Sequence, residues 1–365
     1  MRFRARTIRW RFRTLVAVFL ACGPLLFTPA AIAQGDGVGD DHTAFTTVPL
    51  VSDVEGRAPL TDPQVANAWG ITLGPTTPLW ENNQISGVSN LYSGGAGGLT
   101  KVRSVSVPNG NLTGIAFNDT ADFPVTGSGG TQPARFVFVN LAGQISAWNP
   151  TATPDAAVVQ ASVPGAVYTG LALWRTPLGN FFLAADFAGG KIDVFDDQFR
   201  QVTLPAGFFS DPQVPKGFTP YNVFTVGADV YVAYAMPSPE GPAVRGPGLG
   251  FVNRFTDFGQ KLQRLQRRGV LNAPWALAIA PASFGRFAGE LLVGNLGDGR
   301  ITALDPRTGH NEGQLRDADG RPLAIDGLWS LLPGTATTGG TDALWFSAGP
   351  DNETHGLIGL IKPNG

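Results

Sequence analysis

Short apolar runs recur along the chain at a nearly constant spacing, with turn residues between them. The first run of each group begins, in order, at Trp69, Thr113, Thr169, Asn222, Trp275 and Trp329. A second and often a third run follow, as in 135–139 and then 143–148 of the second group. Runs of this length with alternating polar positions predict β-strands, so the six groups predict six antiparallel sheets.

These sheets predict an all-β fold, a six-bladed β-propeller over residues 45–362. A unit of three or four short strands cannot bury both of its faces alone, so the six copies must pack around a ring. A large β-sandwich is the alternative, but it does not require the same order of runs six times. The last repeat ends after its third strand at 357–361, and an unassigned strand lies at 46–52. We expect this N-terminal strand to complete the sixth sheet and close the ring.

Residues 1–33 have the order of a secretory signal peptide. Six arginines lie within the first thirteen residues, an apolar stretch follows, and Ala31-Ile32-Ala33 matches a cleavage site. Pro24 and Pro29 interrupt the apolar stretch, which argues against a membrane anchor of about 20 residues. We predict cleavage after Ala33, a flexible N-terminal segment over 34–44, and a periplasmic or secreted protein without a transmembrane segment. Lipidation at Cys22 is the alternative.

Composition narrows the classes of partner. Hydrophobic residues make up 43% of the chain and charged residues 15%, which is typical of a globular protein. Without residues 1–33, 20 basic and 28 acidic side chains remain, and this net charge of -8 argues against nucleic-acid binding. Cys22 is the only cysteine, so the processed chain would have neither a disulfide nor a cysteine-ligated metal. The partner expected is a small ligand or a protein.

Asparagine and aspartate recur where the first run of a repeat begins or the second run ends. In a propeller these positions share one face of the ring, and we expect six of them to line one mouth of the channel. The candidates for ligand or metal binding are Asn67, Asn140, Asp186, Asn222, Asn295 and Asp326. Both residue types are common turn formers, which explains each position singly. Their oxygens also suit Ca²⁺ or Mg²⁺, so a divalent cation at this mouth is the second interpretation.

Two further features belong to the same face. Residues 236–248 lengthen the fourth repeat, either as a plain insertion or as a lid or partner-contact loop. His355, near Asp351 and Glu353, is the one candidate general base, and a solvated loop histidine is the alternative.

The order of several motifs resembles an uncharacterised bacterial family of exported β-propeller proteins. These are conserved hypothetical proteins, some of which carry a C-terminal sorting signal. The resemblance rests on segments 50–53, 61–63, 67–71, 184–187, 190–196, 271–278, 292–295, 297–299 and 325–329. The segment Glu81-Asn82-Asn83-Gln84 departs from the Asp-Asn pair of such proteins, which weakens a metal role there. The resemblance implies a propeller and export, and it implies no established activity.

We therefore expect an exported β-propeller that binds a ligand or a protein at the channel mouth. The alternative is a divalent-metal-dependent hydrolase of the lactonase type. This alternative rests on analogy between folds, and no motif supports it. The sequence identifies neither a catalytic residue nor a definite cofactor.

Overall fold

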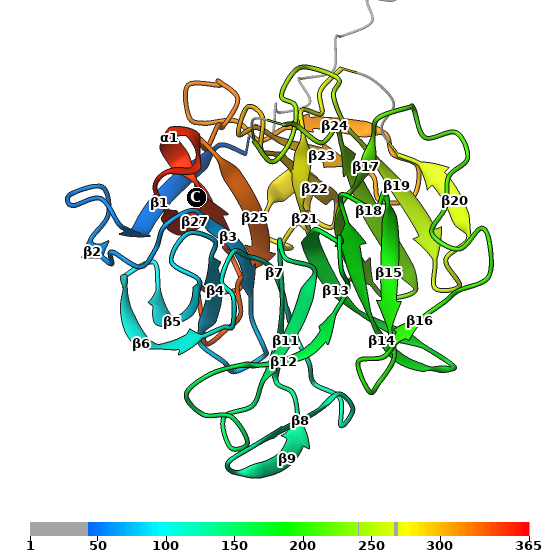
Figure 1. Ribbon diagram of the computed structural model, residues 1–365. Coiled ribbons are helices and arrows are strands. Elements are labelled where there is room, and N and C mark those ends of the chain that lie inside the picture. The colour runs from blue at the N-terminus through cyan, green and yellow to red at the C-terminus, as the bar shows by residue number, and fades with distance from the viewer. Residues whose placement is uncertain (1–42, 240, 266–268, 365) are drawn as a thin grey trace, which may run out of the picture. The chain divides into compact units, whose positions relative to one another are not determined.

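The computed structural model describes residues 43–239, 241–265 and 269–364, which form six antiparallel sheets around a central channel (Figure 1). The predicted six-bladed β-propeller is confirmed. The predicted signal peptide and the segment up to His42 lie outside the described residues. Within the described ranges, no helix combines the length and apolar character needed to cross a bilayer.

Each blade has four main strands, and in blades 1 to 5 these run from the channel outwards in chain order. Blades 1 and 2 consist of β3 (Ala68–Thr72), β4 (Leu79–Asn83), β5 (Val88–Gly95) and β6 (Gly98–Ser106), then β7 (Leu112–Phe117), β10 (Phe136–Asn140), β11 (Gln144–Trp148) and β12 (Val158–Ser162). Blades 3 and 4 consist of β13 (Tyr168–Thr176), β14 (Gly179–Asp186), β15 (Lys191–Phe195) and β16 (Gln201–Val202), then β17 (Thr219–Val226), β18 (Asp229–Ala235), β19 (Phe251–Thr256) and β20 (Lys261–Arg264). Blade 5 consists of β21 (Pro274–Ile279), β22 (Leu291–Asn295), β23 (Ile301–Leu304) and β24 (Asn311–Gln314), with the short helix η1 (Gly285–Phe287) between its first two strands.

Blade 6 joins the two ends of the propeller. It contains β25 (Leu328–Pro333), β26 (Leu344–Ala348) and β27 (Leu357–Pro363), and its outer strand is β1 (Phe45–Ser52). Strand β1 pairs antiparallel with β27, from Phe45 opposite Pro363 to Ser52 opposite Leu357, and β2 (Leu60–Thr61) pairs parallel with β1. Figure 1 shows the blue β1 beside the red β27. The predicted closure by the N-terminal strand is confirmed.

An insertion in blade 2 forms a separate hairpin, β8 (Pro124–Gly127) with β9 (Gly130–Pro133), which projects beyond the blades in Figure 1. Phe123 anchors the insertion because its ring packs 4.4 Å from that of Phe182 in blade 3, centroid to centroid. The insertion therefore belongs to the interface between blades 2 and 3.

Polar side chains on the inner strands connect adjacent blades. Thr113 and Thr169 donate hydrogen bonds of 2.7 Å to the carbonyl oxygens of Tyr168 and Tyr221, each on the next inner strand. The side chains of Asn222 and Ser330 likewise donate hydrogen bonds of 2.8 Å to the carbonyl oxygens of Trp275 and Trp69 on adjacent inner strands. An inner strand is an edge strand with unpaired carbonyl groups, and these side chains satisfy some of them. The polar residue of the repeated motif is thus a structural connection between blades.

Candidate functional site

Aromatic side chains meet near the axis of the ring and form a cluster of Trp69, Phe187, Tyr221, Trp275 and Trp329. Trp69 stacks on Trp329 with ring centroids 3.5 Å apart, and Trp275 contacts both edge-on at 6.3 and 6.1 Å. The tryptophans come from blades 1, 5 and 6. The cluster lies between two cavities, because Trp69 and Phe187 line one of them and Trp275 lines the other.

The first cavity, here called the mouth pocket, has a volume of about 370 Å³. It lies at the end of the channel where the inner strands begin. Loops and strand ends of blades 1, 2, 3, 4 and 6 contribute its lining residues, which are Asn67, Trp69, Gln84, Leu141, Val167, Thr169, Phe187, Ala188, Pro237, Ser238, Gly241, Pro242 and Glu353. Trp69, Phe187 and the two prolines make much of this surface apolar, and Glu353 contributes a carboxyl group.

Glu353 reaches the mouth pocket from an unusual turn. In the short element α1 (Pro350–Glu353), Asp351, Asn352 and Glu353 all have left-handed backbone conformations, with φ of 57°, 57° and 67°. A left-handed conformation costs roughly 1–2 kcal/mol for each residue other than glycine. Strained conformations of this kind persist only where surrounding contacts fix them, and they are concentrated at ligand-binding and catalytic sites.

Several contacts fix the α1 turn. The Asp351 amide donates a 2.9 Å hydrogen bond to Oδ2 of Asp326, and Arg57 donates one of 2.8 Å to the Asp351 carboxylate. The Glu353 side chain forms an ion pair with Arg245, which lies 108 residues away in the loop between β18 and β19. The turn of blade 6 is therefore connected to blade 4 across the mouth.

Burial defines the chemistry of this corner of the pocket. The Glu353 side chain is 14% exposed, and its burial raises the pKa of its carboxyl group, although the Arg245 guanidinium opposes the rise. The nearby Tyr221 is fully buried, and its hydroxyl has no hydrogen-bond partner among the described residues. The buried Trp69 Nε1 likewise lacks a partner among them. Buried polar groups are usually paired, so unpaired groups in the aromatic cluster beneath the pocket are unusual.

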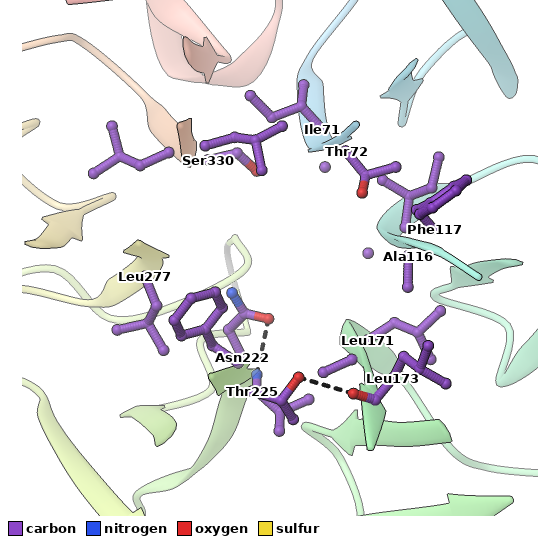
Figure 2. A pocket seen from close by; sticks show the side chains of 18 of the residues that line it. Ile71, Thr72, Ala116, Phe117, Leu171, Leu173, Asn222, Thr225, Leu277 and Ser330 are labelled. Carbon is purple, nitrogen blue, oxygen red and sulfur yellow. Dashed lines mark hydrogen bonds between the residues drawn. The ribbon is translucent and has the colours of Figure 1, made fainter. Parts of the chain in front are cut away.

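The second cavity, here called the channel cavity, lies on the other side of the aromatic cluster and has a volume of about 300 Å³. Figure 2 shows its side chains around an open centre, with residues of all six inner strands contributing. Corresponding apolar residues of the six repeats form its wall, namely Ile71, Ile115, Leu171, Phe224, Leu277 and Leu331. The channel cavity is therefore a direct product of the repeat, whereas the mouth pocket consists mainly of residues that differ between blades.

Three of the six predicted site residues bind backbone amides of nearby strand ends and turns through a side-chain oxygen. The Asn140 Oδ1 accepts hydrogen bonds from the amides of Ala142 and Gln144 at 3.1 and 3.0 Å. The Asp186 Oδ1 accepts from the amides of Val167 and Gly189 at 3.0 and 2.9 Å. The Asn295 Oδ1 accepts from the Asn272 amide at 3.1 Å. Each of these oxygens is thus already paired with backbone donors.

The other three predicted residues occupy different places. Asn67 lines the mouth pocket and accepts a 2.6 Å hydrogen bond from Trp329 Nε1, so it orients the aromatic cluster. Asn222 lines the channel cavity and connects blade 4 to blade 5. Asp326 holds the α1 turn and thereby positions Glu353. Of the six, only Asn67 lines the mouth pocket.

The proposed general base is also paired. His355 Nδ1 lies 2.8 Å from Oδ2 of Asp53, and the Gly356 amide donates to the other oxygen of the same carboxylate at 2.9 Å. Among the described residues, no group of three or more histidine, cysteine, aspartate or glutamate side chains is placed to hold a metal ion. The divalent cation at the mouth stays a prediction.

The sequence alone did not single out Glu353, Phe187 or Ala188 as site residues. Phe187 and Ala188 directly follow the predicted turn residue Asp186, and Glu353 lies in a segment that was expected on the same face but was not among the six candidates. The extended loop 236–248 was the most informative signal. Its residues Pro237 and Pro242 line the mouth pocket, so the predicted position of this loop on the same face is confirmed.

The chain is similar to uncharacterised proteins of Acanthamoeba polyphaga mimivirus. Protein R648 is 33% identical over 323 residues, which are 86% of this chain and 78% of the relative. Protein L690 is 32% identical over 326 residues, which are 86% and 84% of the two chains. The chain belongs to the family of these viral proteins. Protein R640 is 31% identical over 239 residues, and the matched region covers 62% of this chain and 44% of R640. No protein-family profile matches the chain.

Solved structures show weaker similarity. One match is the structure of BBS1N in complex with ARL6DN. The aligned region covers 88% of this chain and 98% of the matched chain, with a TM-score of 0.47 and 10% sequence identity. A second match is virginiamycin B lyase from Staphylococcus aureus. The aligned region covers 88% of this chain and 99% of the lyase chain, with a TM-score of 0.46 and 13% sequence identity.

The expected membership of a bacterial family of exported propellers is wrong, because the relatives are proteins of a giant virus. The motifs behind that expectation have structural roles in the blades. Gly190 and Gly299 adopt φ of 70° and 69° in the turns before β15 and β23, and Trp69, Trp275 and Trp329 form the aromatic cluster. Such residues are required by blade geometry, so they indicate a propeller and do not identify its source.

Proposed function

We propose that this β-propeller is a binding module that holds a small ligand in its mouth pocket. The observation that carries the proposal is the α1 turn, in which three consecutive left-handed residues place the half-buried Glu353 carboxyl group beside an aromatic surface. Ligand pockets typically combine an apolar lining with a few fixed polar groups. The mouth pocket has this composition.

The arrangement of oxygen atoms supports binding over metal-dependent hydrolysis. The oxygens of Asn140, Asp186 and Asn295 accept hydrogen bonds from backbone amides, and His355 pairs with Asp53. A lactonase-type site would need several oxygen ligands directed at one point and a free base. Ligand binding requires only the mouth pocket and the fixed α1 turn beside it.

A blocking variant tests the proposal. Ala188 is exposed at the pocket wall, so Ala188→Trp should fill the pocket without disturbing the blade core. Leu178→Trp is the matched control, because Leu178 is 83% exposed in the hairpin between β13 and β14, at the opposite end of the channel. Purified wild-type protein is screened against a small-molecule library by thermal shift, and hits are titrated into both variants.

We expect ligands that bind the wild type and the Leu178→Trp variant but lose at least about 90% of their binding to the Ala188→Trp variant. The apolar wall is then occupied by the introduced indole ring, which removes the ligand's contact area. Ligands that bind the two variants equally well, or a library without any binder, would contradict the proposed function.

A further inference from the structure

We propose that the ligand of the mouth pocket is an organic ammonium cation, with Trp69 and Phe187 as aromatic walls and Glu353 as the counter-charge. This inference rests on the proposed function and specifies the chemical class of its ligand.

The charges of the lining favour a cation. Among the described residues that line the mouth pocket, Glu353 is the only ionisable side chain, and none is lysine, arginine or histidine. An anionic ligand would meet a carboxylate and no compensating charge in the lining. A cation would meet the opposite charge at short range in a partly dehydrated site, where attraction is stronger than in bulk water.

The ion pair with Arg245 leaves Glu353 able to accept a second cation. Arg245 contacts Oε1 of the carboxylate through one guanidinium nitrogen, Nη2. This is a single contact rather than the bidentate arrangement in which a guanidinium group binds both oxygens. Arg245 does not line the mouth pocket, so it forms its ion pair with Glu353 from outside the pocket.

The aromatic residues favour an alkylated ammonium group over a small hydrated ion. Aromatic rings attract quaternary ammonium ligands through the negative potential of their faces. Among the cation–aromatic contacts of the described residues, none places an arginine or lysine over Trp69 or Phe187. The neighbouring Leu141, Val167 and Pro237 offer apolar contact to alkyl groups, which a hydrated Ca²⁺ or Mg²⁺ ion would not use.

The test compares choline with its uncharged isostere 3,3-dimethylbutan-1-ol. Both are titrated into the purified protein, and binding is followed by the fluorescence of the tryptophan cluster that includes Trp69. The variants are Glu353→Gln, which removes the charge inside the pocket, and Asp155→Asn, which removes an acidic charge between β11 and β12, outside the pocket. The Asp155 side chain is 97% exposed, does not line the mouth pocket and makes no contact that fixes the α1 turn, so it is a matched control.

We expect choline to bind wild-type protein at least about tenfold more tightly than the isostere, as a cation–π contact with a desolvated charge predicts. Glu353→Gln should reduce this preference to less than about twofold, whereas Asp155→Asn should preserve it. Ala188→Trp should abolish choline binding.

Two results would overturn the cation assignment. Equal affinity of wild-type protein for choline and its isostere would show that charge is not recognised, while the proposed binding function would stand. Absence of binding by both compounds would also reject the assignment. The proposed function would then fail only if the library screen gave no ligand that Ala188→Trp blocks.

Discussion

The two ends of the channel are built from the same strands in different ways. The channel cavity is lined by corresponding residues of all six repeats, such as Ile71, Leu171 and Leu277. The mouth pocket combines the repeat residues Trp69 and Thr169 with residues from outside the repeat, including Pro237 and Glu353. A repeat conserves what every blade needs in order to pack, so residues that depart from the repeat are free to carry a specific function. This contrast is why we assign binding to the mouth pocket.

Removal of the closing strand should have the largest effect, because both cavities require a closed ring. A chain that begins at residue 54 lacks β1, which leaves β27 as an unpaired edge and removes the buried Leu50 and Val51. We expect loss of the cooperative thermal transition, measured by circular dichroism against the chain that begins at residue 34. A truncated chain with an unchanged melting temperature would contradict the closure.

Substitution in the wall of the channel should have the next largest effect. A Cβ atom added at Gly170 would lie 2.1 Å from Oδ1 and 2.8 Å from Cα of Asn222 in the next blade. Gly170→Ala should therefore lower the free energy of unfolding by roughly 1–3 kcal/mol, the usual cost of overpacking. Gly97→Ala is the control, because a Cβ atom there meets nothing within 4 Å. Equal stability of the two variants in urea unfolding would show that blades 3 and 4 are not tightly packed at Gly170 and Asn222.

A comparison of Glu81 with Glu353 separates a structural role from a role in binding. Glu81 in β4 is fully buried, and burial raises its pKa well above the ordinary value of 4.5. Its Oε2 accepts a 2.7 Å hydrogen bond from Asn83, while its Oε1 has no partner among the described residues. Unlike Glu353, it lines neither of the two cavities. We therefore expect Glu81 to affect stability and Glu353 to affect binding.

The pH dependence follows from the direction of the Glu81 shift. A raised pKa in the folded state means that the unfolded chain loses this proton first, so stability falls as pH rises above about 4.5. Glu81→Gln should remove this loss, so the stability of the variant relative to wild type should be greater at pH 7 than at pH 4. Thermal unfolding between pH 4 and pH 8 measures the difference. A constant difference across this range would show that Glu81 has an ordinary pKa in the folded protein.

The sequence predicted the ring well because the ring depends on periodic features. The repeated runs located the inner strands, and the unassigned strand at 46–52 predicted β1 and its pairing with β27. Asparagine and aspartate were a poor guide to the pocket because most of them satisfy backbone amides in turns, as Asn140 and Asp186 do. Trp69, Trp275 and Trp329 begin three of the repeated runs, but their packing against one another depends on how the closed ring places three blades, which the alternation of residues does not encode.

Glu353 could not have been chosen from sequence for two physical reasons. Its left-handed backbone is unusual for the segment Asp351-Asn352-Glu353, which contains no glycine. Its partner Arg245 is 108 residues away, and only the closed ring brings the two together. Loop residues far apart in sequence meet at the mouth because the blades fix them there.

A crystal of the protein soaked with choline would locate the bound ligand. We predict electron density for the ligand in the mouth pocket, with the ammonium group against Trp69 and Phe187 and within about 4–6 Å of the Glu353 carboxylate. Density for the ligand in the channel cavity and not in the mouth pocket would contradict the assignment of binding to the residues that depart from the repeat.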